Sequence, residues 1–178
     1  MSLRKTLRDK MLTVWVGEPW YGASSKAIHA DISASEAAYR PIAGVQNIWE
    51  TTLHMVAWTE EAASRVRGNE AHEPERGDWP PMPDVTPQLW HETIAQLGAA
   101  RQELLDALEK VHEEDLYTQV PRALGNALSN ALGNALGNAL GTDGSRNPRA
   151  QNARGLVVHD LCHLVQIAAF QQECHASC

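Results

Sequence analysis

The spacing of apolar side chains along the chain predicts four helices. In four segments apolar residues recur every three or four positions, which is the period of an amphipathic helix, and no run of residues is typical of a strand. Gly17 and Gly68 end the first two segments, and Pro87 suits the first turn of the third. The predicted helices are residues 2–16, 45–67, 87–112 and a last one from about 155 to 172.

Between the first two segments the pattern predicts a loop that contains one short helical stretch. The sequence here is WYGASSKAIHADISASEAAYRP. Ser35 is the candidate cap for one or two helical turns, which have to stop before Pro41.

The connection between the second and third helices bears on the topology. It is polar, rich in proline and nearly twenty residues long. The second helix is about 34 Å long at about 1.5 Å per residue, and an extended connection at about 3.3 Å per residue reaches well past that length. The two helices can therefore run parallel, joined by a crossover, and the four segments favour an all-α four-helix bundle.

Residues 123–141 repeat a four-residue unit, Ala-Leu-Gly-Asn, almost without change. Such a unit is too short to form a supersecondary element, which takes about 20 residues or more. The glycines and asparagines oppose a helix, whereas the leucines would form one ridge along it. The tract is either a weak helix docked through its leucines or a loop. We interpret it as a low-complexity insertion in a single domain that spans residues 1–178.

Composition and charge exclude several classes of protein. The 178 residues are 43% hydrophobic and include six tryptophans, which suits one globular domain. The net charge of −7 argues against a nucleic-acid partner. No stretch approaches the roughly 18 unbroken apolar residues of a membrane span, and the N-terminus is not a signal peptide. Cys162, Cys174 and Cys178 form no disulfide framework, so we expect a reducing cytoplasm.

The stretch HDLCHLVQ, residues 159–166, carries the candidate chemistry. On a helix His159, His163 and Gln166 fall within about 60° of arc, so two imidazoles one turn apart can reach the same ion. The alternative is a pair of hydrogen-bonded histidines on a partly exposed face. The helix is apolar on nearly every side, which predicts that it is buried, and buried polar side chains need partners. These observations leave both interpretations open.

A third ligand has to come from another segment, and His54 is the first candidate. It lies in NIWETTLHMVAW, at the edge of the apolar stripe, with Glu50 one turn before it. The alternative is a histidine that bonds Glu50 and binds no metal. Glu109 and His112 form one E-x-x-H pair, which is too few for a di-iron bundle. Cys162 is predicted to be a small buried side chain rather than a ligand.

Together these segments resemble a known family. The histidine within NIWETTLHMVAW, the terminal HDLCHLVQI, the early WYGASS, the phrase SEAAYRP and the DWPPMP turn are similar to the DinB/YfiT-like superfamily of damage-inducible, metal-binding proteins. The resemblance implies a four-helix bundle with an up-down-down-up path and long crossover connections. It also implies one divalent metal ion per chain, held by His54, His159 and His163, with Zn²⁺ favoured and Ni, Fe or Mn as alternatives.

The resemblance also implies a class of chemistry. Characterised relatives include metal-dependent thiol transferases that use bacillithiol or mycothiol, a mycothiol-dependent isomerase and proposed hydrolases. The expected function is therefore metal-dependent S-transfer between a small thiol and an electrophile. The alternatives are a metal-dependent hydrolase and a non-enzymatic stress-response protein that binds metal. The sequence assigns no catalytic residue, and Glu50 and Gln166 are expected to contact the ligands or the substrate.

The last predicted helix also bears on the oligomeric state. A helix in a single-layer bundle should show a polar face to water, but the side opposite the two histidines is apolar. Either the connections cover this side, or it lies at or near a two-fold interface, and we expect a homodimer. The residues on that side are Val157, Leu161, Leu164 and Ala168.

Overall fold

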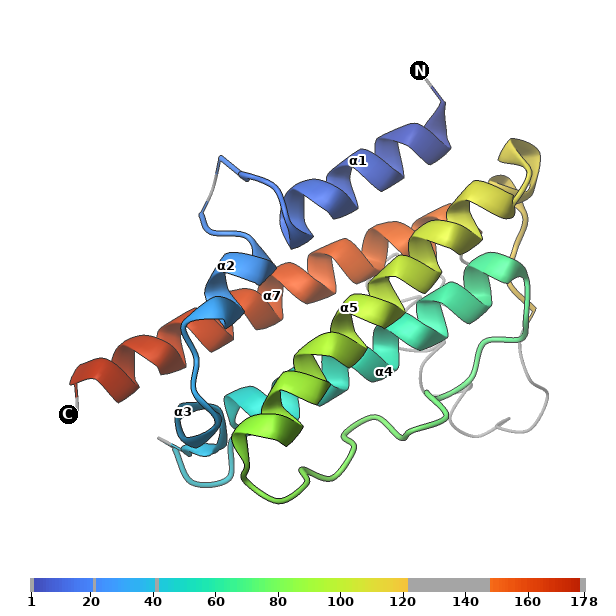
Figure 1. Ribbon diagram of the computed structural model, residues 1–178. Coiled ribbons are helices and arrows are strands. Elements are labelled where there is room, and N and C mark those ends of the chain that lie inside the picture. The colour runs from blue at the N-terminus through green and yellow to red at the C-terminus, as the bar shows by residue number, and fades with distance from the viewer. Residues whose placement is uncertain (1, 21, 41, 122–147, 177–178) are drawn as a thin grey trace, which may run out of the picture.

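The computed structural model describes residues 2–20, 22–40, 42–121 and 148–176 (Figure 1). Within these ranges there is no strand, only an isolated bridge between Gln119 and Pro148. The fold is therefore all-α, as the periodicity predicts. The elements are α1 (Leu3–Trp15), α2 (Ser25–Ala30), α3 (Ala34–Ala38), α4 (Ile48–Arg67), α5 (Pro87–Lys110), the 3-10 helix η1 (Glu113–Tyr117) and α7 (Arg149–Ala176).

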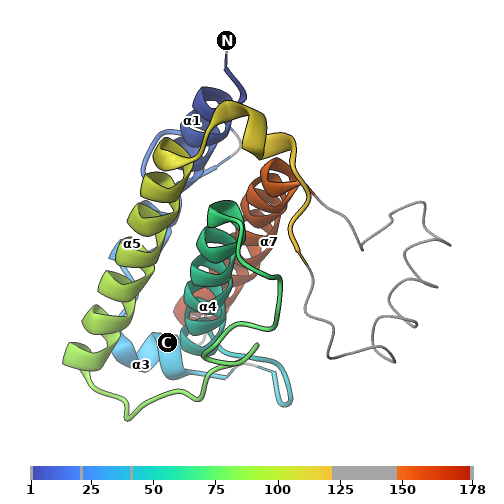
Figure 2. The same ribbon diagram turned by 90° about the vertical axis from the view of Figure 1, so that its right-hand side faces the viewer.

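Four long helices make up the bundle. In Figure 1 the colours show that α4 and α5 run in the same direction, whereas α1 and α7 run in the opposite one. α4 packs against both α5 and α7, and α1 packs against α7. Figure 2 shows α5 on one side of α4 and α7 on the other. The core between these helices contains large, fully buried side chains, among them Trp15, Trp49, Met55, Leu104 and Ile167.

Local chemistry fixes both ends of α4, the helix that carries His54. Asn47 Oδ1 accepts a hydrogen bond from the Glu50 backbone N–H at 2.9 Å, and the Glu50 carboxylate accepts one from the Asn47 N–H at 2.9 Å. At the other end Gly68 has a φ of 95°, a left-handed conformation that a residue with a Cβ adopts only with strain. The following connection returns along the bundle to the start of α5 (Figure 1).

The largest differences between the observed and predicted helix boundaries lie at both ends of α7 and in the segment before α4, and the 3-10 helix Glu113–Tyr117 was not predicted. The segment Ser25–Ala30 is a short helix rather than a loop, because the Ser24 hydroxyl accepts from the Ala27 N–H. The next helical turns are present as predicted, but Ser33 caps them in place of Ser35. The last helix begins at Arg149 rather than near residue 155.

The exposure of α7 corrects two predictions. Leu164, on the side expected to need a cover, is only 4% exposed and belongs to the core. Val158 and Val165 lie on another face and are 61% and 71% exposed, so the helix is not buried on all sides. Cys162 lies on that face too, as an exposed free cysteine rather than a small buried side chain. The side of α7 that was expected to need a partner thus packs against the core of the protein itself, and the homodimer stays a prediction.

Two further predictions concern the connections and the membrane. The Ala-Leu-Gly-Asn tract at residues 123–141 lies outside the described residues. Among the helices of the described ranges, none is both long enough and apolar enough to cross a membrane.

Candidate metal centre

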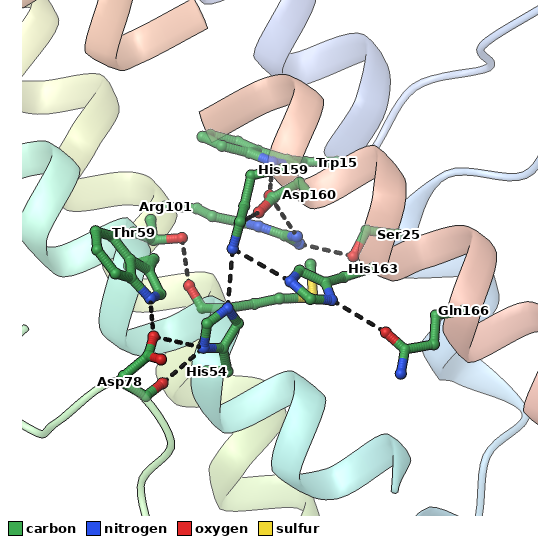
Figure 3. A network of polar contacts seen from close by, with 12 residues as sticks. Trp15, Ser25, His54, Thr59, Asp78, Arg101, His159, Asp160, His163 and Gln166 are labelled. Carbon is green, nitrogen blue, oxygen red and sulfur yellow. Dashed lines mark hydrogen bonds and ion pairs between the residues drawn. The ribbon is translucent and has the colours of Figure 1, made fainter. Parts of the chain in front are cut away.

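Three histidine rings from two helices meet between α4 and α7. His54 comes from the middle of α4, and His159 and His163 lie one turn apart on α7. The His159 Nε2 atom is 2.9 Å from Nε2 of His54 and 3.2 Å from Nε2 of His163 (Figure 3). The structure thus brings together the three residues that the sequence resemblance selects.

The other nitrogen of each ring faces an oxygen. His54 Nδ1 donates to the backbone carbonyl of Asp78 at 2.6 Å, and His163 Nδ1 lies 3.3 Å from Gln166 Oε1 (Figure 3). A carbonyl oxygen can only accept, so these contacts place the ring proton of each neutral imidazole on Nδ1. The Nε2 atoms of His54 and His163 therefore carry lone pairs.

These lone pairs converge on one point, which suits a bound cation. His54 Nε2 and His163 Nε2 both lie at hydrogen-bond distance from His159 Nε2, which carries at most one proton and can donate it to only one of them, whereas a metal ion can bind all three nitrogens. A tetrahedral Zn²⁺ with Zn–N bonds of about 2.05 Å separates its nitrogens by about 3.3 Å, close to the 2.9 and 3.2 Å found here. All three ligand nitrogens lie within 4.8 Å of one another, so His54, His159 and His163 could hold one divalent ion.

The environment keeps two of the rings neutral. Burial lowers the pKa of His54 below its ordinary value, and the nearby His159 adds to this effect, while the hydrogen bond to the Asp78 carbonyl opposes it. Burial also lowers the pKa of His163, again reinforced by His159 and opposed by Gln166. Neutral imidazole is the form that binds metal, so both rings are ready to act as ligands at neutral pH.

The crossover between α4 and α5 covers one side of the cluster. Trp79 stacks on His54, with ring centroids 3.9 Å apart and planes inclined by 11°. Asp78 is fixed by Trp58, whose Nε1–H donates to Asp78 Oδ1 at 2.7 Å. The turn DWPPMP therefore supports the His54 ring from a segment more than twenty residues further along the chain. Neither Asp78 nor Trp79 was assigned a role from the sequence, although their turn contributed to the family resemblance.

Asp160 lies behind His159 and is fully buried. Its carboxylate accepts from Trp15 Nε1 at 2.8 Å and from Arg101 Nη2 at 3.2 Å (Figure 3). Its other oxygen, Oδ1, is 3.7 Å from His159 Nδ1, and neither atom has a hydrogen-bond partner among the described residues. A small rotation of the His159 ring would close this contact and complete the same tautomer as in the other two histidines.

The surroundings of Asp160 favour its charged, deprotonated form. Burial alone would raise the pKa of this carboxyl. The His159 ring, the Arg101 guanidinium and the Trp15 N–H outweigh burial and hold the pKa below its ordinary value. The carboxylate is therefore available to orient His159, a role that the sequence did not reveal although the two residues are adjacent.

The remaining candidates lie in different places. Gln166 contacts His163, as expected for a residue next to a ligand. The hydrogen bonds of Glu50 go to Asn47 and to Arg40, at 2.7 and 2.8 Å, and the partner of His54 Nδ1 is the Asp78 carbonyl. Cys162 is not part of the cluster.

A comparison with family models identifies the family of the chain. The family model of the DinB superfamily matches residues 24–141, a range that includes His54 and the crossover turn and ends before α7. No curated protein and no solved structure matches the chain significantly. Since the family match covers more than half of the sequence, the chain belongs to the DinB superfamily.

Proposed function

We propose that this protein is a metal-dependent enzyme that transfers a small thiol of the bacillithiol or mycothiol type to an electrophile. The observation that carries the proposal is the convergence of three imidazole Nε2 atoms, from His54, His159 and His163, beside an open cavity. Three nitrogen ligands leave a coordination position free, which is the arrangement of catalytic rather than structural zinc sites.

The cavity lies on the side of the cluster where His159 is partly exposed. It has a volume of about 180 Å³ and is lined by α4 and α7. Trp58 and Arg65 form one wall, with the Arg65 guanidinium 5.5 Å from the centroid of the Trp58 ring. Arg65 Nη1 also bonds Asn152 of α7 at 3.3 Å, which ties the two walls together. A substrate in this cavity would meet His159 directly.

Different residues would bind the metal ion and orient its ligands. His54, His159 and His163 would hold a divalent ion, while Asp78 and Gln166 keep the ring protons of His54 and His163 on Nδ1. When bound, such an ion supplies positive charge that favours loss of the proton from a thiol at the free position. Trp79 stacks on the His54 ring and covers one of its faces.

The lining of the cavity favours a thiol over water as the nucleophile. Among the described residues that line it, only Arg65 and His159 are ionisable, and none is a carboxylate. Metal-dependent hydrolases commonly use a carboxylate as general base for water, and this cavity offers none. A thiol has an ordinary pKa of about 8.5 and ionises without such a base. A reducing cytoplasm, which the cysteines predict, would keep the thiol substrate reduced.

The test is conjugation of small thiols with 1-chloro-2,4-dinitrobenzene. In the reaction a carbon–sulfur bond forms, chloride leaves with the electron pair of the broken carbon–chlorine bond, and the thiol proton passes to solvent. We expect protein loaded with Zn²⁺ or Ni²⁺ to accelerate the reaction for at least one of cysteine, bacillithiol or mycothiol. Chelation or His163→Ala should remove this acceleration.

A matched variant separates catalysis from metal storage. Gly155 borders the cavity, and a Cβ added there meets no atom within 4 Å. Gly155→Phe should therefore narrow the cavity and slow conjugation while metal content stays the same. Metal-dependent ester hydrolysis without conjugation would overturn the thiol assignment, and full metal occupancy without either reaction would support the non-enzymatic alternative.

A further inference from the structure

A second and larger cavity lies away from the three histidines. It has a volume of about 570 Å³ and is enclosed by residues of α1, α2 and α5. In Figure 1, α1 and α2 lie on one side of this region and α5 on the other. The volume falls within the range of about 300–1,000 Å³ that is usual for small-molecule sites. None of the three candidate metal ligands lines it.

The walls of this cavity are largely apolar. Trp90, Ile94 and Leu97 of α5 form one side, and Leu12 and Trp15 of α1 belong to the other. Trp90 is held in place by its indole N–H, which donates to the backbone carbonyl of Ile32 at 2.7 Å. A rigid apolar wall of this kind suits a flat or aliphatic body in the ligand.

The charged residues around the cavity all have one sign. Lys26 and Arg101 line it, and among the described residues of its lining there is no aspartate or glutamate. This contrasts with the chain as a whole, whose net charge is −7. His29, which also lines the cavity, adds no charge, because burial lowers its pKa to about 4. The positive charge of the residues that line this cavity favours a ligand with an anionic group.

Arg101 offers a donor that the protein does not use. The residue is 8% exposed, and its Nη1 and Nη2 atoms donate to Ser25 Oγ at 2.9 Å and to Asp160 Oδ2 at 3.2 Å. Its Nε–H has no hydrogen-bond partner among the described residues. A buried, ionised donor without a partner is uncommon, because the lost hydrogen bond to water is costly. An acceptor oxygen of a ligand would satisfy it.

We propose that this cavity binds a small amphipathic carboxylate, with its apolar body against Trp90, Ile94 and Leu97 and its anionic head toward Arg101 and Lys26. The carboxylate accepts from Arg101 Nε–H and pairs with the Lys26 ammonium group at the cavity edge. Asp160 offsets part of the Arg101 charge from behind, so Lys26 supplies the uncompensated positive charge. The site is independent of the proposed thiol transfer.

The probe for this site is 4-phenylbutyrate, and its neutral counterpart is 4-phenylbutan-1-ol. Isothermal titration of the full-length protein should show that the carboxylate binds more tightly than the alcohol, by roughly tenfold for one charge-assisted contact. Lys26→Met should reduce that advantage by a similar factor and leave the affinity for the alcohol unchanged. Metal content should be the same in both proteins.

A pair of glycine variants locates the binding. Gly98 of α5 borders this cavity, Gly155 of α7 borders the smaller one beside His159, and a Cβ added at either glycine meets no atom within 4 Å. Phenylalanine is also a better helix former than glycine, so both variants should fold. Gly98→Phe should weaken binding of 4-phenylbutyrate by more than about tenfold by occupying its space, whereas Gly155→Phe should leave it unchanged.

Three outcomes would overturn the proposal. The first is that 4-phenylbutyrate does not bind at millimolar concentration. The second is that the acid and the alcohol bind equally, which would remove the role of Lys26 and Arg101. The third is that binding survives Gly98→Phe and is lost in Gly155→Phe, which would place the carboxylate at the histidine cluster.

Discussion

Two buried histidines of this bundle, His29 on α2 and His54 on α4, are each 6% exposed and each has neighbours at both ring nitrogens. The neighbours differ in kind. His29 Nδ1 lies 2.8 Å from the backbone carbonyl of Ser25, and its Nε2 lies 3.3 Å from the hydroxyl of Thr52. The Thr52 hydroxyl, which also donates to the Ile48 carbonyl at 2.8 Å, can share its proton with His29 Nε2, so no second imidazole and no cation is needed at this ring.

The His54 ring is complete on one side only. Its Nδ1 donates to the Asp78 carbonyl, but its Nε2 faces Nε2 of His159 at 2.9 Å. His159 Nε2 also lies 3.2 Å from Nε2 of His163, and a single His159 proton cannot satisfy both lone pairs, whereas one metal ion can bind all three nitrogens. Burial is therefore a poor guide to metal binding here, and the donor or acceptor character of the facing atom is the better one.

Among the changes that test this difference between the two histidines, removal of a metal ligand should have the largest effect on metal affinity. His163→Ala should lower the affinity for divalent metal by more than about a hundredfold, beyond the usual loss on removing a partner that only orients a ligand. His29→Gln should leave metal content unchanged, because His29 is no part of the cluster. Metal analysis of the purified proteins measures both. Full occupancy in His163→Ala would contradict the assignment of the site.

Asp160→Asn should have the next largest effect on metal affinity. An amide in place of the carboxylate weakens the orientation of His159, and we expect metal affinity to fall about 10–100-fold. It also leaves Arg101 without its buried counter-ion, at a cost of about 3–5 kcal/mol in the free energy of unfolding.

Ser25→Ala is the control for this change. It removes the other side-chain hydrogen bond of Arg101, and it should cost only about 1–3 kcal/mol of stability without altering metal affinity. If Asp160→Asn lost stability but kept full metal affinity, the role of Asp160 would be limited to pairing with Arg101.

Some of this site could be read from the sequence because its signals are local. His159 and His163 are four residues apart on a strongly periodic segment, and helical geometry alone brings them together. The long helices were equally predictable from periodicity, and so were the helical turns of Ala34–Ala38, although Ser33 rather than the predicted Ser35 caps them. These features depend on residues within one or two helical turns of each other.

Other parts depend on the path of the chain and could not be read in this way. Asp78 reaches His54 because the crossover returns along the bundle, and no local pattern carries that information. Glu50 lies one helical turn from His54, but the capping box with Asn47 and the contact with Arg40 hold its carboxylate at the helix end. Val165 is apolar yet 71% exposed, and its residue type does not distinguish it from the apolar residues of α7 that pack into the core.

The pH dependence of stability should show that the buried His29 ring is neutral. Its pKa is about 4 in the folded protein and about 6.5 when unfolded. The unfolded chain therefore binds a proton between these values and the folded protein does not, so stability falls as pH falls from about 6.5 to about 4. The expected loss is about 3 kcal/mol. Urea unfolding at several pH values should show a shallower decrease for His29→Gln, and equal slopes would contradict the neutral state of the buried ring.

The smallest effect is expected at Gln166, which tests how much the orientation of a single ring matters. Its Oε1 lies 3.3 Å from His163 Nδ1, a longer contact than the 2.6 Å between His54 Nδ1 and the Asp78 carbonyl. Gln166→Leu should therefore lower metal affinity only several-fold, at or below the lower end of the roughly 10–100-fold range for such partners. It should not alter the pH dependence of unfolding attributed to His29, which lies on a different helix. Competition with a chelator of known affinity measures the first effect. A loss as large as that of His163→Ala would mean that Gln166 is itself a ligand rather than the residue that orients one.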